Sequence, residues 1–116
     1  MLDKHIRSFG YAWQGIRRAW REEMNFRIEV LIGIAATVLG ILLRIDTGEW
    51  ALIALASALV LASEAFNTAF EELCDMLRPE HDPHVAKIKD LAAGAVLLSA
   101  IGATVIGLII FIPHIL

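Results

Sequence analysis

Four polar side chains recur at helical spacing in a stretch of the chain that is otherwise largely apolar. Glu64, Asn67, Glu71 and Asp75 follow one another at intervals of three, four and four residues. On an α-helix these positions share one face. In a membrane-spanning helix each carboxylate would cost several kcal/mol, so such a residue is a functional candidate by default. The stripe therefore predicts a site facing protein or water, or else a hydrogen-bonded seam between helices.

Two further groups of polar residues accompany this stripe. Glu23 lies before the first long apolar stretch, and Lys89-Asp90 lies just before the last one. Carboxylate and amide oxygens suit Mg²⁺, a lysine can offset phosphate charge, and a buried carboxylate can accept a proton from an alcohol. This combination favours phosphoryl transfer at a membrane surface. The sequence has neither the G-x-x-x-x-G-K-[ST] nor the G-x-G-x-x-G pattern, so a nucleotide site would need another architecture.

The composition identifies the class of protein in which these residues must be positioned. The 116 residues are 58% hydrophobic and 20% charged, with mean hydropathy +0.66. Soluble domains are typically about 45–50% apolar, and one this small could not bury so much apolar surface. The net charge of −3 offers no basic field for nucleic acid, so a nucleic-acid partner is not expected. We therefore expect a single-domain, all-α membrane protein over residues 1–116.

Three apolar stretches predict transmembrane helices at about 28–46, 49–72 and 88–112. The clearest is Leu91–Ile112, which holds 22 uncharged residues. At 1.5 Å per residue this stretch spans about 33 Å, close to the hydrocarbon thickness of a bilayer. The first two are shorter and need their flanking residues to cross. Three buried soluble helices are disfavoured because too little polar sequence would remain to cover them.

The segment 1–27 has the pattern of an amphipathic helix. Its apolar positions recur at intervals of three and four residues: Ile6, Phe9, Trp13, Ile16 and Trp20. Its polar positions fall on the opposite side of the helix: Arg7, Gln14, Arg18 and Arg21. Aromatic residues opposite arginines are typical of a helix at the membrane surface. The alternative is a helix packed on a soluble partner.

Basic residues and small residues add predictions of orientation and assembly. With the N-terminus and the second connection in the cytoplasm, nine of ten Lys and Arg residues lie on one side of the membrane, as the positive-inside rule expects.

Small residues repeat every four positions in the third span, at Ala95, Ser99, Ala103 and Gly107. Such stripes allow close helix packing, and three helices alone make a thin bundle. We therefore expect the chain to self-associate.

Two histidines lie in the second connection. His81 and His84 flank Asp82 and Pro83. Two histidines three positions apart could contact a metal ion. Solvated loop histidines are the favoured interpretation, and their role stays open.

Several motifs together resemble one protein family. Residues 64–71 read Glu-Ala-Phe-Asn-Thr-Ala-Phe-Glu, and similar stretches lie at 9–16, 23–27 and 89–97. With the length and the three spans, they make the chain resemble the prokaryotic diacylglycerol kinase and undecaprenol kinase family of small integral-membrane lipid kinases. The resemblance covers nearly the whole chain. It implies a homotrimeric bundle in the bacterial cytoplasmic (inner) membrane, with active sites shared between subunits.

The resemblance also implies roles for the polar stripe. Glu64 matches the proposed general base that deprotonates the lipid hydroxyl. Glu23 and Glu71 match carboxylates that hold Mg²⁺ with ATP. Asn67 matches a residue that orders the site, and Asp75 lies on the same face as a supporting polar group.

A nucleotide-binding set follows from the same resemblance. Lys89 and Asp90 match nucleotide-contacting residues, beside Glu23 and Glu71. Some family members carry a serine where this chain has Ala12, so only a backbone contact to ATP is expected there. The second connection also departs from the common Glu-Tyr-His pattern of the family, and this removes the basis for a phosphate contact from that loop.

We therefore expect ATP- and Mg²⁺-dependent phosphorylation of a membrane lipid alcohol at the cytoplasmic face. The lipid alcohol is diacylglycerol or undecaprenol, and some phrases look more like the undecaprenol kinase branch. Three alternatives stay open: a non-catalytic membrane assembly protein, an ion or proton transporter built around Glu64, and a pseudokinase of the same family. The transporter predicts flux without nucleotide, and the assembly protein predicts no dependence on ATP.

Overall fold

The computed structural model describes residues 1–77 and 82–116, and both parts are almost entirely helical. The helices, in chain order, are α1 (Leu2–Glu22), α2 (Met24–Leu43), α3 (Thr47–Leu77) and α4 (Pro83–Ile115). Helices α2, α3 and α4 are each long and apolar enough to cross a membrane. The prediction of an all-α protein with three such helices is confirmed.

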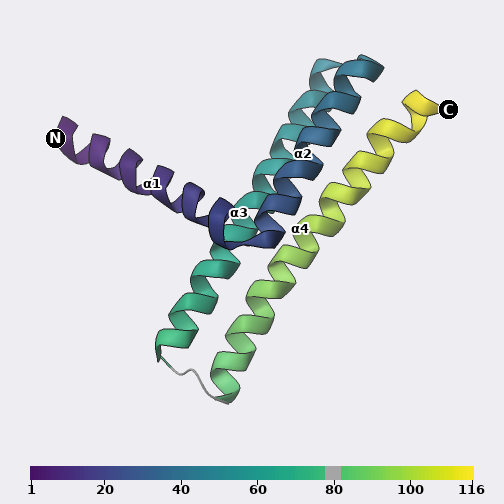
Figure 1. Cartoon of the computed structure of the whole chain (residues 1–116). Coiled ribbons are helices and arrows are strands. Elements are labelled where there is room, and N and C mark those ends of the chain that lie inside the picture. The colour runs from purple at the N-terminus through teal and green to yellow at the C-terminus, as the bar shows by residue number, and fades with distance from the viewer. Residues whose placement is uncertain (78–81) are drawn as a thin grey trace.

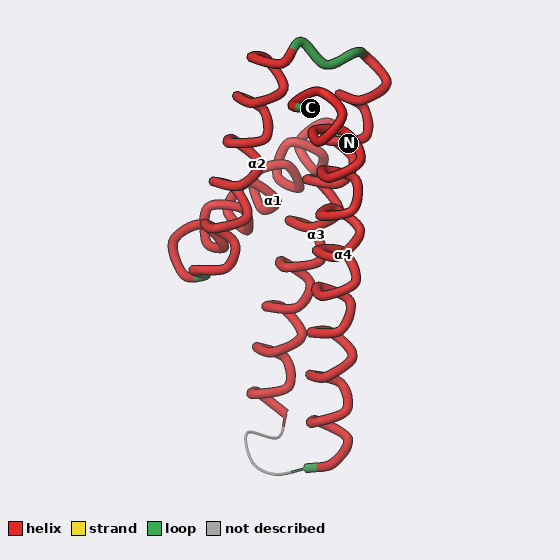
Figure 2. The backbone as a smooth tube through the Cα atoms, turned by 90° about the vertical axis from the view of Figure 1, so that its right-hand side faces the viewer, coloured by secondary structure: helices red, strands yellow, loops and turns green. Residues whose placement is uncertain are grey.

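The helices form a bundle of three with one arm (Figure 1). The most extensive packing is between α3 and α4, which run antiparallel, and α2 lies against α3. Helix α1 leaves the bundle steeply at the start of α2. The last part of α3 and the first part of α4 continue past this point as a two-helix extension (Figures 1 and 2). The molecule therefore has a three-helix half and a two-helix half, with α1 at the boundary.

The junction between α1 and α2 is a single extended residue. Glu23 has φ −114° and ψ 109°, and its N–H donates to the carbonyl of Ala19 at 3.0 Å. The Arg27 guanidinium donates to the carbonyls of Trp20 (2.8 Å) and Arg21 (2.9 Å). These carbonyls have no partner within their own helix, so Arg27 caps α1. The helix consequently ends at Glu22, before the end of the predicted segment 1–27.

A tight turn joins α2 to α3. Arg44 adopts the left-handed conformation (φ 56°, ψ 51°), and the N–H of Ile45 donates to the carbonyl of Gly40 at 3.2 Å. A Cβ on Gly40 would lie 2.7 Å from the Trp50 ring and 2.9 Å from Ile45 Cδ1. Only glycine admits this close approach without a shift of its neighbours, so Gly40 determines how the start of α3 packs on the end of α2.

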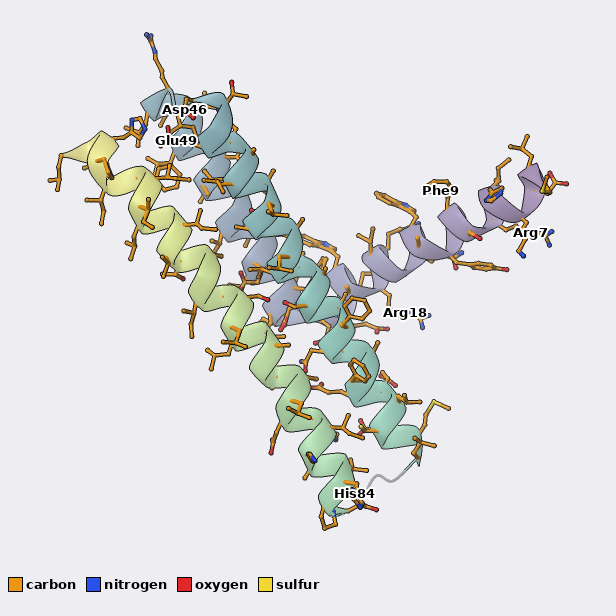
Figure 3. All side chains as sticks on the ribbon, turned by 180° about the vertical axis from the view of Figure 1, so that it is seen from behind. Arg7, Phe9, Arg18, Asp46, Glu49 and His84 are labelled. Carbon is orange, nitrogen blue, oxygen red and sulfur yellow. The ribbon has the colours of Figure 1, made fainter. Side chains whose placement is uncertain are left out.

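Helix α3 begins with reciprocal capping. The Asp46 carboxylate accepts from the N–H of Glu49 (2.8 Å), and the Glu49 carboxylate accepts from the N–H of Asp46 (3.1 Å). The His114 side chain near the end of α4 lies 3.0 Å from Glu49 Oε1 (Figure 3 labels Asp46 and Glu49). These contacts link the first turn of α3 to the last turn of α4.

Helix α4 begins earlier in the sequence than its predicted membrane span. Asp82 is its N-cap and accepts from the N–H of His84 at 2.8 Å, with Pro83 in the first turn. Proline and an Asp cap both favour a helix start. His84 is thus an exposed residue of the first helical turn rather than of a loop. The prediction for His81 lies outside the described residues.

Little of the apolar surface is buried within one chain. A small core forms around Ile45, Ile53 and Ile110, at the three-helix half of the bundle. Large apolar side chains along all four helices stay exposed, among them Leu55 at 66% and Leu98 at 72%. Soluble monomers rarely expose so much contiguous apolar surface, so lipid or other subunits must cover these faces.

Candidate functional site

Among the described residues, Glu64 is the charged residue whose side chain is buried. One of its carboxylate oxygens has no hydrogen-bond partner. Only 5% of its surface is accessible. Its Oε2 atom is enclosed and makes no hydrogen bond. Buried polar atoms are nearly always paired, so an unpaired one needs an explanation. An acceptor atom in this state is available to a donor brought by a ligand.

The carboxylates of Glu29, Glu23 and Glu71 act electrostatically on Glu64. They come from three places in the fold: Glu23 from the α1–α2 junction, Glu29 from α2, and Glu71 from α3 two turns beyond Glu64. The fold therefore brings carboxylates from two separate segments of the chain within electrostatic range of Glu64. Such a concentration of negative charge favours a cationic ligand.

Glu29 was not predicted as a site residue, although the structure brings its carboxylate close enough to act electrostatically on Glu64. It lines two hollows, one of about 380 Å³ between α2 and α3 and one of about 90 Å³ that α4 also lines, and both are shared with Gly33 and Ser57. The available signal was a carboxylate at the start of an apolar stretch. That signal alone does not say which helix the side chain faces, so only the packing of α2 on α3 revealed Glu29.

Asn67 lies between Glu64 and Glu71 on the same face of α3, as the spacing predicts. Its Nδ2 donates to Glu71 Oε1 at 3.3 Å. Its Oδ1 is enclosed and has no partner. Asn67 thus orients the Glu71 carboxylate and leaves a second acceptor free, one turn from that of Glu64.

The polar stripe continues into the two-helix extension through an ion pair. Lys89 Nζ on α4 donates to Asp75 Oδ1 on α3 at 2.8 Å. Both side chains are partly accessible, so the attraction between them is screened by water. The pair holds the lysine ammonium on the face of α3 that carries Glu71.

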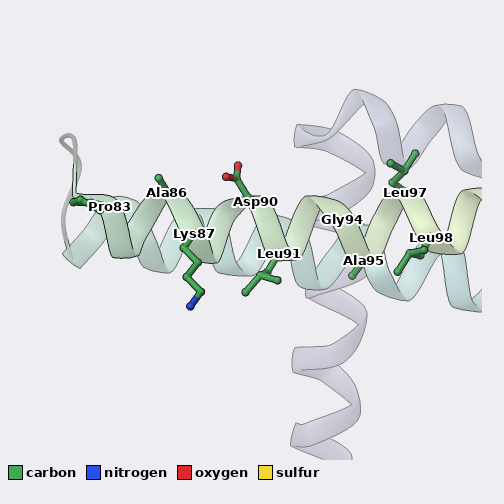
Figure 4. Close-up of a pocket in the computed structure, with 9 residues that line it drawn as sticks. All are labelled: Pro83, Ala86, Lys87, Asp90, Leu91, Gly94, Ala95, Leu97 and Leu98. Carbon is green, nitrogen blue, oxygen red and sulfur yellow. The ribbon is translucent and has the colours of Figure 1, made fainter.

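Two predicted site residues do not join this cluster. Ala12 is exposed on α1. Asp90 lines an open hollow of about 840 Å³ along α4, and Figure 4 shows Asp90 and Lys87 extending from opposite sides of the helix. Within one subunit no hydrogen bond or ion pair connects Asp90 to the described carboxylates of the stripe. Any role of Ala12 or Asp90 beside them would require a bound ligand or a neighbouring subunit.

The donor set suits a magnesium ion only together with another ligand. Within residues 1–77 and 82–116, no three His, Cys, Asp or Glu side chains are arranged to hold a metal ion. Mg²⁺ typically takes one or two protein carboxylates and completes its octahedron with phosphate oxygens and water. Glu23 and Glu71 supply hard oxygen ligands of this kind. The residues present therefore fit a Mg²⁺ ion that arrives with a nucleotide.

These features define a class of protein: a small helical membrane protein with a carboxylate-rich site where a lateral helix meets the bundle. A sequence model of the family described as prokaryotic diacylglycerol kinase matches residues 10–111. The chain belongs to this family. The prediction from the sequence motifs is thereby confirmed, and so is the predicted class of enzyme, a lipid kinase.

Curated relatives carry both names of the predicted family. The chain is 41% identical over 110 residues to a diacylglycerol kinase of Synechocystis sp., with 94% of this chain covered. It is 35% identical over 112 residues to an undecaprenol kinase of Bacillus subtilis, covering 97% of this chain and 91% of that protein. A diacylglycerol kinase of Escherichia coli is 31% identical over 109 residues, covering 94% and 89%.

The relatives differ in length. The match spans 63% of the Synechocystis protein, against about nine tenths of the Bacillus and Escherichia proteins. Relatives named for either lipid thus match nearly the whole of this chain. The similarity therefore identifies the family to which both kinds of relative belong.

Proposed function

We propose that this protein transfers the γ-phosphoryl group of ATP to the hydroxyl of a membrane lipid alcohol, with Glu64 as the general base. The observation that carries the proposal is the enclosed, unpartnered Oε2 atom of Glu64. A lipid hydroxyl that donates to this atom would satisfy it. Hydrogen-bond contact between base and hydroxyl is the geometric requirement of general base catalysis.

The reaction balances with the groups available. The Glu64 carboxylate takes the hydroxyl proton as the alcohol oxygen attacks the γ-phosphorus of ATP. The bond between that phosphorus and the β,γ-bridging oxygen breaks, and ADP leaves. The products are a lipid phosphate, ADP and a protonated Glu64, which then loses its proton to solvent. Diacylglycerol and undecaprenol each present a primary alcohol, so the same step serves either lipid.

The neighbouring residues bind and orient the reactants. Glu23 and Glu71 would hold Mg²⁺, which when bound neutralises phosphate charge. Asn67 keeps the Glu71 carboxylate oriented through their 3.3 Å hydrogen bond. Lys89, placed by Asp75, offsets charge on the nucleotide. Ala12, through its backbone, and Asp90 would contact the nucleotide in the assembled protein.

The position of the site, where α1 meets the bundle, supports its placement at the cytoplasmic face of the inner membrane. We propose that α1 lies on that face as an amphipathic surface helix, with the N-terminus in the cytoplasm. The two-helix extension then reaches beyond the membrane surface, where soluble ATP is available. A homotrimer is supported by the large apolar faces that one chain leaves exposed. In such an assembly the site would be completed by a neighbouring subunit.

Reconstituted protein with Mg²⁺, radiolabelled ATP and either diacylglycerol or undecaprenol tests the proposal. We expect one lipid to be phosphorylated, and the Glu64→Gln variant to lose this activity while still assembling. Phosphorylation of neither lipid by folded, assembled protein would contradict the kinase and favour an assembly protein or pseudokinase. Activity that survives in Glu64→Gln would contradict the role of Glu64 only.

A further inference from the structure

The angle between α1 and α2 determines where the Glu23 carboxylate lies. Glu23 is the single residue between the two helices, so it is both the C-cap of α1 and the N-cap of α2. Its side chain makes no capping hydrogen bond to the N–H groups at the start of α2. The carboxylate is therefore available to a ligand, and its position follows from the backbone at the junction.

Side-chain packing fixes this angle only weakly. Ala19 is the buried residue of α1, and the other residues of that helix are exposed. A mainly apolar hollow of about 550 Å³ separates α1 from α2 and α3, and Arg17 and Arg21 of α1 border it. Figure 1 shows most of α1 projecting away from the bundle. A lateral helix with so little packing needs another contact to hold its direction.

Arg27 supplies such a contact. It lies in the first turn of α2, and its Nη1 atom donates to the carbonyls of both Trp20 (2.8 Å) and Arg21 (2.9 Å) in the last turn of α1. Hydrogen bonds from a charged donor are among the stronger ones, and the helix dipole also favours a cation at a helix C-terminus. The N–H of Arg27 donates to the Glu23 carbonyl at 3.2 Å. Arg27 thus holds the chain on both sides of Glu23.

We propose that Arg27 is a positioning residue, which holds the last turn of α1 and thereby keeps the Glu23 carboxylate in the region of Glu64 and Glu71. The carboxylates of Glu23 and Glu71 both act electrostatically on Glu64, so the folded chain brings all three into one region. The inference rests on the proposed function, in which Glu23 and Glu71 hold a Mg²⁺ ion that arrives with ATP. Without Arg27, α1 would sample other directions and carry Glu23 away from that ion.

Binding of Mn²⁺, a paramagnetic substitute for Mg²⁺, tests this role without measuring turnover. The full chain in detergent micelles is titrated with Mn²⁺ and a non-hydrolysable ATP analogue, and water proton relaxation measures the protein-bound complex. Arg27→Met keeps a long side chain that cannot donate to the carbonyls. We expect its dissociation constant for Mn²⁺ to rise by about tenfold, as is typical when the outer support of a metal ligand is lost. Partial unfolding would lower the number of sites and not their affinity.

Arg27→Lys separates a positioning role from direct contact with the nucleotide. Both hydrogen bonds leave one nitrogen atom, so a lysine ammonium can also make them, although its side chain is one bond shorter. We expect Arg27→Lys to retain most of the affinity for Mn²⁺. A guanidinium that binds phosphate through two parallel hydrogen bonds cannot be replaced in this way. A loss in Arg27→Lys as large as in Arg27→Met would therefore assign Arg27 to the nucleotide and overturn the inference.

Arg7→Met is the matched control. The Arg7 side chain also donates to a carbonyl four residues away, that of Asp3 at 3.3 Å, but both residues belong to α1. This variant removes the same charge without releasing the junction, so the affinity for Mn²⁺ should be unchanged. An equal loss in Arg7→Met would assign the effect to general charge and overturn the inference. Far-UV circular dichroism verifies that the variants keep their helices.

A double variant distinguishes failure of this inference from failure of the proposed function. If Arg27 acts through Glu23, Arg27→Met should weaken Mn²⁺ binding no further in a chain that already carries Glu23→Gln. Additive losses, or an unchanged affinity in Arg27→Met alone, would overturn the inference and leave the metal role of Glu23 intact. An unchanged affinity in Glu23→Gln alone would overturn that metal role and, with it, the positioning of Glu23 for a metal ion.

Discussion

Two glutamates of α3 occupy contrasting environments. Glu49, in the first turn, has both carboxylate oxygens within 3.2 Å of a partner, through His114 and the backbone of Asp46. Glu64, four turns later, is more deeply buried and has an enclosed oxygen with no partner. The same side chain therefore completes a structural contact at one position and leaves an unmet hydrogen-bonding requirement at the other.

This difference distinguishes a residue that stabilises the fold, Glu49, from a residue that is available for chemistry, Glu64. A buried polar atom without a partner costs about 1–3 kcal/mol. An apolar residue at position 64 would therefore stabilise the fold more than the buried glutamate does. Glu49, in contrast, joins the ends of two helices. A feature that costs stability persists when it serves a ligand. The contrast favours assigning function to the Glu64 region rather than to the Glu49 end of α3.

The strongest test of the contrast compares Glu64→Gln with Glu49→Gln. Removing a general base typically lowers turnover by a factor of about 10²–10⁴, so Glu64→Gln should lose activity to that extent while assembly persists. Glu49→Gln should keep its turnover within about twofold and lose some resistance to unfolding in detergent. Turnover is measured as ADP release under saturating substrates. Comparable turnover in the two variants would remove the proposed distinction.

The metal role of Glu71 is tested by titration with magnesium. Glu71→Gln should need roughly tenfold more Mg²⁺, or more, for half-maximal activity, because a neutral amide is a weaker ligand than a carboxylate. Even the loss of an outer-shell partner of a metal ligand typically costs about 10–100-fold in affinity. Glu72→Gln is the matched control, an exposed neighbour that lies off the stripe. An unchanged magnesium titration in Glu71→Gln would assign that carboxylate to positioning alone.

The packing at the Glu49 end predicts an effect on stability without an effect on chemistry. Gly40→Ala would place a methyl group 2.7 Å from the Trp50 ring. Overpacking of this kind typically costs about 1–3 kcal/mol of unfolding free energy. Gly102→Ala is the control, since a Cβ there has no neighbour within 4 Å. Unfolding in mixed detergent micelles measures both variants, and equal stability would show that the α2–α3 turn adjusts freely.

The smallest expected effect concerns the contact between α3 and α4. His114→Gln should lower the unfolding free energy by less than about 1 kcal/mol, the range of partly exposed ion pairs. It should leave turnover unchanged, because His114 lies at the opposite end of the bundle from the two-helix extension. A double-mutant cycle with Glu49→Gln isolates the pairwise energy. A large loss of turnover in His114→Gln would mean that the Glu49 end communicates with the site.

Local periodicity accounts for the parts of the fold that the sequence predicts well. The three spans follow from long uncharged stretches, since a helix satisfies its own backbone in lipid. The register of Glu64, Asn67 and Glu71 follows from 3.6 residues per turn, and the Asn67–Glu71 hydrogen bond agrees with it. Helix ends were less predictable. The early end of α1 depends on Arg27, which reaches back to two carbonyls across the junction.

The helices, the polar stripe on α3 and the family could all be predicted from the sequence, because each of these is encoded in local spacing and motif. The tertiary structure was needed to show that Glu29 of α2 lies close enough to act electrostatically on Glu64, that Lys89 pairs with Asp75, and that Arg17 and Arg21 border an apolar hollow. These relations join residues of different helices. They depend on how close two backbones approach and in which direction each helix turns its face, and helical periodicity along one segment carries no information on either.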